Sequence, residues 1–234
     1  MSKTALVAAA LALPVAAWAG VVVKSSGPSA GTYKVGTKVV DGAKITLRAG
    51  DRVTVLTSKG TQVLKGAGTF TVGEKPKEPR LRFSNFTRKG AAGRVRTGAV
   101  RTAEESKPDR PNLWYVNLTE AGTTCLYDFG TVRLWRPDSS EAATYTMVEP
   151  AAADAVEVHF EAGESERVLN SERLVLAEDR TYAVRAAPED EPVTMTFALV
   201  DEYETPDQLA EMLVAKGCEA QLALMADRLE ADAE

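Results

Sequence analysis

Apolar and polar residues follow a short-strand pattern from Val21 to about Gly73. The segments are one run of β-branched valines and four alternating stretches, each bounded by glycine or aspartate: Val21–Val23, Lys44–Leu47, Arg52–Leu56, Thr61–Leu64 and Thr69–Val72. Period-two alternation between turn residues is typical of β-strands. The pattern predicts a small β-sandwich or β-roll over residues 20–73.

A second strand-rich region covers residues 112–203. About seven short segments in roughly 90 residues alternate in the same way, beginning near Leu113, Thr124, Val132, Ala143, Ala155, Thr181 and Val193. Strands at this spacing predict an immunoglobulin-like β-sandwich. Tyr182, six residues after Leu176, is similar to the tyrosine corner of such domains, in which the hydroxyl bonds back to the preceding turn.

The apolar period changes to that of a helix in residues 204–231. Thr205 is a candidate N-cap, Pro206 suits the first helical position, Gln208 suits the capping box, and Gly217 is a candidate stop. Apolar residues then recur at helical spacing as far as Leu229. We expect a helical hairpin or one bent helix, packed on the second sandwich.

Residues 74–111 separate the two strand-rich regions and differ from both. They carry eleven Lys or Arg against five Asp or Glu, together with four prolines and few large apolar residues. This composition predicts a linker or long exposed loop. Its arginines, among them Arg94, Arg96 and Arg101, could form a patch for an acidic polymer or lipid headgroup. Alternatively, the segment is a solvated connector whose charge is attracted to the chain's own acidic regions.

Residues 1–19 have the pattern of a secretory signal peptide. Lys3 precedes a short apolar run, and Ala17-Trp18-Ala19 is a small-x-small cleavage signal. The run is shorter than the ~20 residues that span a bilayer, and no later stretch approaches that length. The sequence therefore predicts cleavage before Gly20, a periplasmic location and no stable membrane insertion.

The two cysteines and the net charge narrow the functional classes. Cys125 and Cys218 form an even pair, which in an exported protein favours a disulfide over two buried free thiols. The formal net charge is −5, whereas nucleic-acid binding calls for a basic surface. We therefore expect no nucleic-acid partner.

Four aromatic residues lie close together at the start of the second region: Trp114, Tyr115, Tyr127 and Trp135. Exposed on one face, they would stack against sugar rings or a peptide. Buried, they would form part of the sandwich core, as tryptophans of such domains commonly do. Both interpretations remain open at this point.

The sequence predicts no catalytic residue, metal site or cofactor. His159 is the only histidine, and it alternates out of phase with Val158 and Phe160, so it is expected on the solvent face. The carboxylates around Gly163 and at 189–191 resemble charged turns. Only such carboxylates could provide acid–base catalysis, for example on an envelope glycan.

The first strand-rich region resembles a known family. Gly36 to Leu47 leads into Ala49-Gly50-Asp51-Arg52 and the strand to Leu56, followed by Gly60-Thr61 and the glycines at 66 and 68. This run looks like the periplasmic domain of the FecR family of ferric-citrate sensor regulators. The resemblance implies a β-roll acting in signalling or as an extracytoplasmic interaction module. The whole layout is also similar to exported alphaproteobacterial proteins of uncharacterised activity.

The expected fold is therefore mainly β: a FecR-like β domain, a basic linker, an immunoglobulin-like sandwich and a C-terminal helical segment. The expected function is a non-enzymatic interaction module that binds a protein partner or an envelope polymer, with extracytoplasmic signalling as one context in which it could act. The alternatives are a carboxylate-dependent hydrolase of envelope glycans and a purely structural envelope component.

Overall fold

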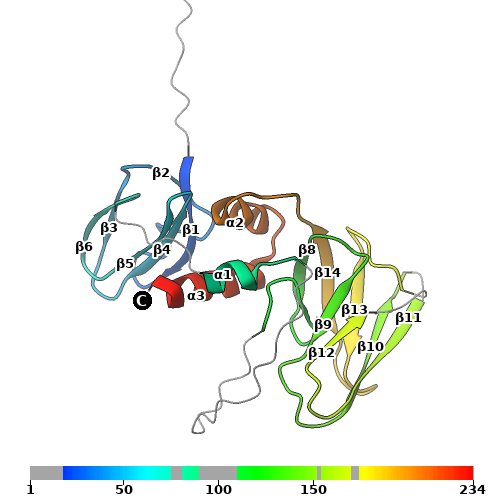
Figure 1. Cartoon of the computed structure of the whole chain (residues 1–234). Coiled ribbons are helices and arrows are strands. Elements are labelled where there is room, and N and C mark those ends of the chain that lie inside the picture. The colour runs from blue at the N-terminus through cyan, green and yellow to red at the C-terminus, as the bar shows by residue number, and fades with distance from the viewer. Residues whose placement is uncertain (1–17, 75–80, 90–109, 152–153, 170–173, 234) are drawn as a thin grey trace, which may run out of the picture.

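The chain folds into two β units with helices between them (Figure 1). The computed structural model describes residues 18–74, 81–89, 110–151, 154–169 and 174–233. The predicted mainly-β fold with a C-terminal helical segment is confirmed. Most of the predicted signal peptide, residues 1–17, lies outside the described residues, and the expected cleavage after Ala19 falls near the start of the first strand.

The N-terminal unit consists of two sheets packed face to face. One has the order β2-β1-β4-β5 and the other pairs β3 with β6. The strands are β1 (Trp18–Ser26), β2 (Lys38–Val40), β3 (Lys44–Leu47), β4 (Arg52–Thr57), β5 (Gly60–Lys65) and β6 (Gly68–Thr71). Alternate residues of the strands, including Val22, Val53 and Val55, meet Ile45 and Leu47 in the core between the sheets.

The Gly50-Asp51 pair makes the turn into β4. Gly50 has a φ of +85°, a conformation that residues with a Cβ rarely adopt. The buried carboxylate of Asp51 accepts hydrogen bonds from the backbone N–H groups of Ser29 (2.8 Å) and Arg48. Burial alone would raise the pKa of Asp51, but these hydrogen bonds outweigh it and lower the pKa. The sequence motif that suggests the FecR family thus has a structural role here.

The second unit is a sandwich of a five-stranded sheet and a three-stranded sheet. Their orders are β11-β10-β13-β14-β8 and β12-β9-β7. The strands are β7 (Val116–Asn117), β8 (Gly122–Leu126), β9 (Val132–Trp135), β10 (Ala143–Glu149), β11 (Asp154–Phe160), β12 (Glu166–Leu169), β13 (Thr181–Arg185) and β14 (Val193–Leu199). Its core, which includes Met147, Phe160 and Phe197, comes entirely from residues of this unit.

The predicted tyrosine corner is confirmed. The Tyr182 side chain is fully buried in the sandwich core, and its ring packs edge-on against Phe197. The hydroxyl accepts a hydrogen bond from the N–H of Ala177 (2.9 Å) and donates one to the carbonyl of Val175 (3.2 Å). These two bonds fix the loop before β13 to the strand that follows it.

The helices are α1 (Leu81–Phe86), α2 (Pro206–Ala215) and α3 (Glu219–Ala233). The N-terminal signals of α2 are confirmed, because Pro206 occupies the first turn and Gln208 Oε1 accepts from the backbone N–H groups of Glu204 and Thr205. The predicted stop is also confirmed. Gly217 has a φ of +73°, and its N–H and that of Cys218 donate to the carbonyls of Val214 and Leu213. This pattern is a Schellman motif.

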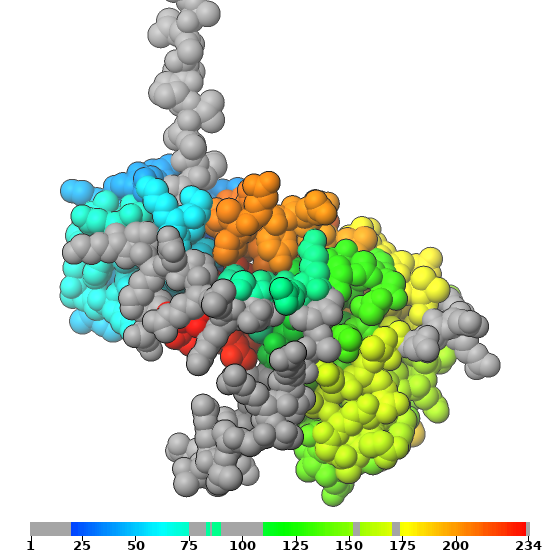
Figure 2. Space-filling view, viewed as in Figure 1, coloured from blue at the N-terminus to red at the C-terminus, as the bar shows by residue number. Residues whose placement is uncertain are grey.

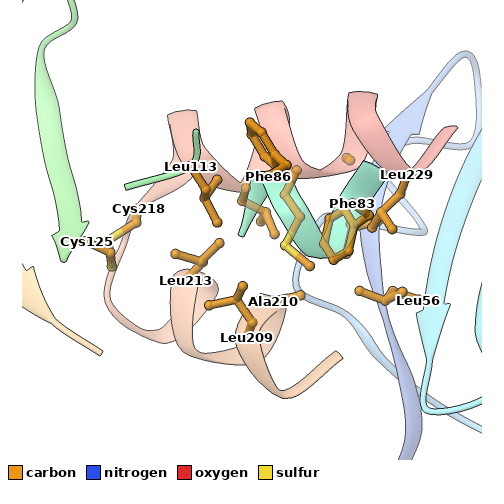
Figure 3. Packing of buried hydrophobic residues seen from close by; sticks show 14 of the residues in the cluster. Leu56, Phe83, Phe86, Leu113, Cys125, Leu209, Ala210, Leu213, Cys218 and Leu229 are labelled. Carbon is orange, nitrogen blue, oxygen red and sulfur yellow. A yellow bond between two sulfur atoms is a disulfide. The ribbon is translucent and has the colours of Figure 1, made fainter. Parts of the chain in front are cut away.

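The position of the α2–α3 hairpin differs from the sequence prediction. It packs against the outer face of the N-terminal sheet, with α3 also contacting β8, rather than on the second sandwich alone (Figure 3). Val21, Val23 and Leu56 of the N-terminal unit share this cluster with Leu209, Leu213 and Leu229 of the hairpin. The reason is that β1 is apolar on both faces, so the face turned away from Ile45 also needs a cover. In the space-filling view α2, in orange, sits between the two units (Figure 2).

Part of the predicted basic linker is helical. Within residues 74–111, α1 contributes Phe83 and Phe86 to the cluster beneath α3. Arg94, Arg96 and Arg101 lie outside the described residues. Within the described ranges, no helix is both long enough and apolar enough to cross a membrane.

Candidate functional site

The junction between the two β units brings aromatic residues from three parts of the chain around the segment that follows α1. Trp114 precedes β7, Tyr127 follows β8, and Tyr203 lies just before α2. Trp114 packs edge-on against Tyr127 with ring centroids 5.7 Å apart, and lies 6.3 Å from Tyr203 at an angle of 37°. Such separations are those at which aromatic rings attract one another.

Hydrogen bonds hold the segment after α1 against these rings. The carbonyl of Thr87 accepts from the indole N–H of Trp114 (2.8 Å) and from the Tyr203 hydroxyl (3.2 Å). The carbonyl of Arg88 accepts from the side-chain amide of Asn112 (3.2 Å). The indole N–H of Trp114 and the hydroxyl of Tyr203 thereby have hydrogen-bond partners, and the position of Lys89 is set by its neighbours.

The ammonium group of Lys89 lies over two tyrosine rings. Its Nζ is 5.9 Å from the ring centroid of Tyr127 and 5.7 Å from that of Tyr203. Trp114 is buried, both tyrosines are half-buried, and Lys89 is exposed. A cation over an exposed aromatic face gains about 0.5–1 kcal/mol. The junction is therefore an aromatic surface that can accommodate a cation and that holds one from its own chain.

The four predicted aromatic residues do not form one exposed face. Trp114, Tyr115 and Trp135 are 3%, 2% and 5% exposed, as expected if they belong to the core. Only Tyr127 is half-buried, and Trp114 is the member of the group that packs against it.

The buried Arg110 guanidinium donates to the carbonyl of Tyr115 (3.0 Å) and to Glu120 (2.9 Å).

Sequence reasoning missed Tyr203 and Lys89. Tyr203 follows the last strand of the sandwich and precedes the helix N-cap, so it belongs to neither pattern. Lys89 is one of many cations in a basic segment. Only the tertiary arrangement distinguishes it, because the tyrosines beneath it lie 38 and 114 positions further along the chain.

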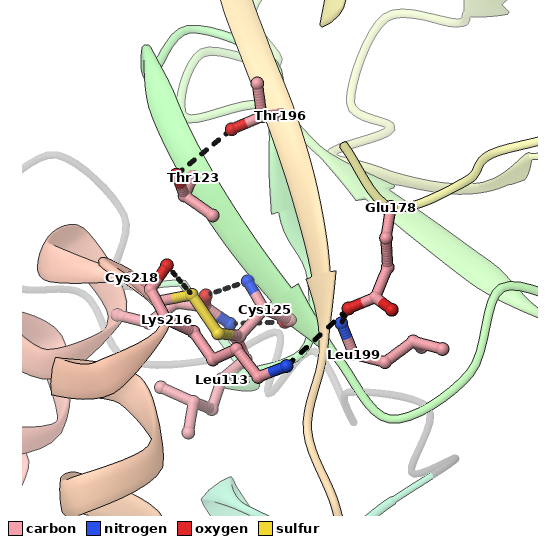
Figure 4. Close-up of a disulfide and its surroundings, with 9 residues drawn as sticks. Leu113, Thr123, Cys125, Glu178, Thr196, Leu199, Lys216 and Cys218 are labelled. Carbon is pink, nitrogen blue, oxygen red and sulfur yellow. Dashed lines mark hydrogen bonds and ion pairs between the residues drawn. A yellow bond between two sulfur atoms is a disulfide. The ribbon is translucent and has the colours of Figure 1, made fainter. Parts of the chain in front are cut away.

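A second cluster beside the junction joins α3 to the sandwich. Cys125 of β8 and Cys218 form a disulfide, which confirms the predicted pair (Figure 4). The buried side chain of Gln221 accepts from the N–H of Cys125 (2.6 Å) and donates to its carbonyl (2.8 Å) and to that of Leu113 (2.9 Å). Gln221 thus pairs with β8 much as a neighbouring strand would.

A third cluster joins α3 to the N-terminal sheet. Glu230 lies on α3 and interacts with the side chains of Lys24 (3.2 Å), Arg52 (3.0 Å) and Thr54. Burial alone would raise the pKa of Glu230, but the hydrogen bonds from these groups outweigh it and lower the pKa. Lys24 also pairs with Asp227 at 2.6 Å.

These ion pairs reflect a division of charge along the sequence. Residues 20–73 carry eight Lys or Arg against two Asp or Glu, whereas residues 201–234 carry two against ten. The acidic helical segment therefore packs against the basic unit, and the pairs Lys24–Asp227 and Lys38–Glu211 cross that boundary. Charge complementarity is a second reason, besides the apolar face of β1, for the position of the hairpin.

Of the carboxylates around Gly163, that of Glu164 has a structural role. Glu164 accepts hydrogen bonds from the Arg167 guanidinium (2.6 and 3.0 Å) and from the N–H of Glu161 (2.9 Å). The bonds from Arg167 lower the pKa of Glu164, which is opposite to the shift that a general acid needs. The carboxylate of Asp190 accepts from the N–H of Ala187 within its own turn.

His159 lies on the exposed face of β11, as its alternation predicts. Its Nδ1 is 2.9 Å from the hydroxyl of Thr144, and its Nε2 is 3.4 Å from Glu161. In the part of the chain that the structure describes, no three histidine, cysteine, aspartate or glutamate residues are grouped so as to hold a metal ion.

Comparison with known proteins gives no relative. No family model, no curated protein and no solved structure matches this chain.

Proposed function

We propose that the protein is an exported interaction module that binds a protein partner or an envelope polymer through the junction of its two β units. The observation that carries the proposal is the aromatic surface of Tyr127 and Tyr203, with Trp114 behind it and the Lys89 ammonium over it. Half-exposed tyrosines backed by a buried tryptophan offer a rigid apolar contact area with a polar rim, as binding hot spots do.

The disulfide and the helices support the same proposal. The α2–α3 hairpin is fixed to the sandwich by the Cys125–Cys218 disulfide and Gln221, and to the N-terminal unit by Glu230. A surface built at such a junction keeps its shape in the absence of a partner, and this preorganisation lowers the entropic cost of binding. A signalling role, as the FecR resemblance implies, would require the bound partner to transmit the signal.

The proposal is tested by capture from a periplasmic extract and by co-sedimentation with purified cell-wall sacculi. The Tyr127→Ala/Tyr203→Ala double variant is compared with wild-type protein and with Tyr33→Ala, which removes a half-buried tyrosine of the N-terminal unit. We expect capture that persists at high salt, because the contact is largely apolar. It should be lost in the double variant and retained in Tyr33→Ala.

The two types of target are distinguished by the assay that responds. Co-sedimentation with sacculi identifies the polymer, and a defined band from the extract identifies a protein. Equal capture by the wild type and the double variant, or capture that vanishes for all three proteins at high salt, would contradict the proposal.

A further inference from the structure

Strand β11 is the edge of the five-stranded sheet. Within the described ranges it pairs only with β10. The pairing is continuous over seven positions, from Ala143 opposite Phe160 to Glu149 opposite Asp154, without a bulge. Figure 1 shows β11 at the outer margin of the molecule, on the side away from the helices. One edge of its backbone therefore has hydrogen-bonding groups that none of the described strands uses.

Apart from the charges of Asp154 and Glu157, this edge lacks the features with which proteins usually protect such strands. Short length, proline, bulges and charged side chains, above all lysine, hinder the pairing of an edge strand with another chain. The seven residues of β11 contain neither proline nor lysine, and residues 112–200 contain no lysine at all. By contrast, β2 at an edge of the N-terminal sheet has three residues and begins with Lys38.

The two faces of β11 indicate which side chains an added strand would carry. Val158 and Phe160 are buried in the sandwich core, and Val156 is half-buried at its margin. Glu157 and His159 are exposed on the opposite face, with Glu161 just beyond the strand. An added strand would extend the core with apolar residues beside Val156, and its alternate residues would lie beside Glu157 and Glu161.

The acidic composition of the sandwich indicates which kind of strand could pair with β11. Residues 112–200 carry sixteen Asp or Glu against six Arg. Two copies of this edge would bring like charges together, whereas a strand with cations at alternate positions would place them beside Glu157 and Glu161. Opposite charges across a strand pair are favourable, and like charges directly opposite are destabilising.

We propose that β11 is a docking edge for an extended segment of a partner protein that carries Lys or Arg at every second position, with apolar residues between them. The segment adds a sixth strand to the sheet. Its backbone supplies affinity, and Glu157 supplies the preference for a cation. The inference rests on the proposed function only in taking the partner to be a protein, and it uses a different surface from the tyrosine junction.

The experiment uses a synthetic probe. It is a nine-residue peptide with blocked ends in which arginine alternates with valine or threonine. A second peptide has the same side chains, but alternate backbone nitrogens are methylated on the edge that would face β11. Binding of both to the full-length mature protein is measured by fluorescence anisotropy at low and physiological salt. We expect the first peptide to bind and the methylated peptide to bind at least tenfold more weakly, since it lacks the donors for strand pairing.

Two charge variants distinguish peptide binding at the β11 edge from general attraction of the peptide to an acidic domain. Glu157→Lys reverses the charge on β11, and Glu189→Lys makes the same change in an exposed turn. We expect the first to weaken peptide binding by about five- to tenfold and the second by less than about twofold. Equal effects of the two variants, or equal binding of the two peptides, would overturn the proposal.

Two further outcomes bear on the partner. A concentration-dependent dimer of the peptide-free protein that Glu157→Lys dissociates would assign the edge to a second copy and overturn the choice of a foreign segment. The Tyr127→Ala/Tyr203→Ala variant should bind the peptide as the wild type does. Peptide binding that persists while junction capture fails would leave this proposal standing and reject the junction. The reverse pattern would reject the edge alone.

Discussion

The two β units of this protein complete their cores in different ways. The sandwich of residues 116–197 draws its core entirely from residues of its own unit. The N-terminal unit forms its inner core from its own residues, but the outer face of its larger sheet is covered by α2 and α3, which lie far away in the sequence. A stretch of sequence with a regular strand pattern therefore need not be an independent folding unit.

Strand β1 shows the difference most clearly. Val22 faces the inner core with Ile45, whereas Val21 and Val23 face the hairpin with Leu213. All three valines are at most 2% exposed. Without the helices, Val21 and Val23 would face water, and each buried aliphatic side chain of this size contributes about 1.5–3 kcal/mol. The N-terminal unit thus depends on the C-terminal residues for its stability.

Removing the disulfide should cause the largest loss of stability in the N-terminal unit. The Cys125→Ala/Cys218→Ala variant frees a loop closed across a sequence separation of 93 residues. In the chain-entropy model this costs about 4–5 kcal/mol of the free energy of unfolding. Chemical denaturation with separate probes for the two units should show the N-terminal unit losing more stability than the sandwich. Equal losses in both units would mean that the hairpin does not stabilise the N-terminal unit selectively.

Gln221→Leu should have the next largest effect. The variant leaves the N–H and carbonyl of Cys125 and the carbonyl of Leu113 without their partner in a buried site. Orphaned buried groups of this kind cost about 2–4 kcal/mol in total. The expected result is a lower denaturation midpoint with the disulfide intact. Gln62→Leu is the matched control within the N-terminal unit, where Gln62 joins β5 to Thr71 at the end of β6 and to Gly73 just after it. A neutral Gln221→Leu would show that water replaces the side chain at β8.

Tyr182→Phe should affect the sandwich alone. It removes the hydroxyl that bonds to Ala177 and Val175 while keeping the ring in the core. We expect a loss of about 1–2 kcal/mol in the unfolding of the sandwich, measured by thermal or chemical denaturation. The protection of the backbone amides of β1 and β4 from hydrogen exchange should not change. A matching loss of protection in those strands would indicate that the two units unfold as one.

Acidification should weaken the contact between α3 and the N-terminal sheet. The pKa of Glu230 is lowered in the folded protein, so its ion pairs stabilise the fold above the ordinary glutamate pKa of about 4.3, and this stabilisation is lost as the pH falls through the folded value. The difference in free energy of unfolding between the wild type and Glu230→Gln should be present at pH 7 and close below about pH 4. Glu211→Gln, at the exposed pair with Lys38, should show a much smaller difference at either pH. If the free energies of unfolding of the wild type and Glu230→Gln differed by the same amount at every pH, the role of the charge would be contradicted.

Features encoded locally were predictable from the sequence. The start of α2 depends on Pro206 and Gln208 within one turn, its end depends on Gly217, and the tyrosine corner spans only the residues between Val175 and Tyr182. The disulfide was predictable because the sequence predicts export, and two cysteines in an exported chain tend to pair. None of these inferences needs knowledge of the tertiary fold.

Features that depend on distant contacts were not predictable. The sequence shows that the hairpin is amphipathic but not which face of which unit it covers, because that choice depends on the second apolar face of β1. In the sequence, Gln221 looks like an ordinary helical residue. Its role depends on contact with Cys125 of β8, which is 96 positions away. The aromatic residues could be identified as a group, but their burial and the contribution of Tyr203 depend on how the two units meet.

Hydrogen exchange of the Leu213→Ala variant shows whether α2 and α3 complete the core of the N-terminal unit. Leu213 is fully buried in the cluster shared with Val21 and Val23, whereas Met147, the control site for Met147→Ala, is buried in the sandwich. Both variants should cost about 2–5 kcal/mol. We expect Leu213→Ala to speed amide exchange in β1 and β4 while β10 and β13 stay protected, and Met147→Ala to do the reverse. Exchange in β1 and β4 that is unchanged by Leu213→Ala would contradict this role of α2 and α3.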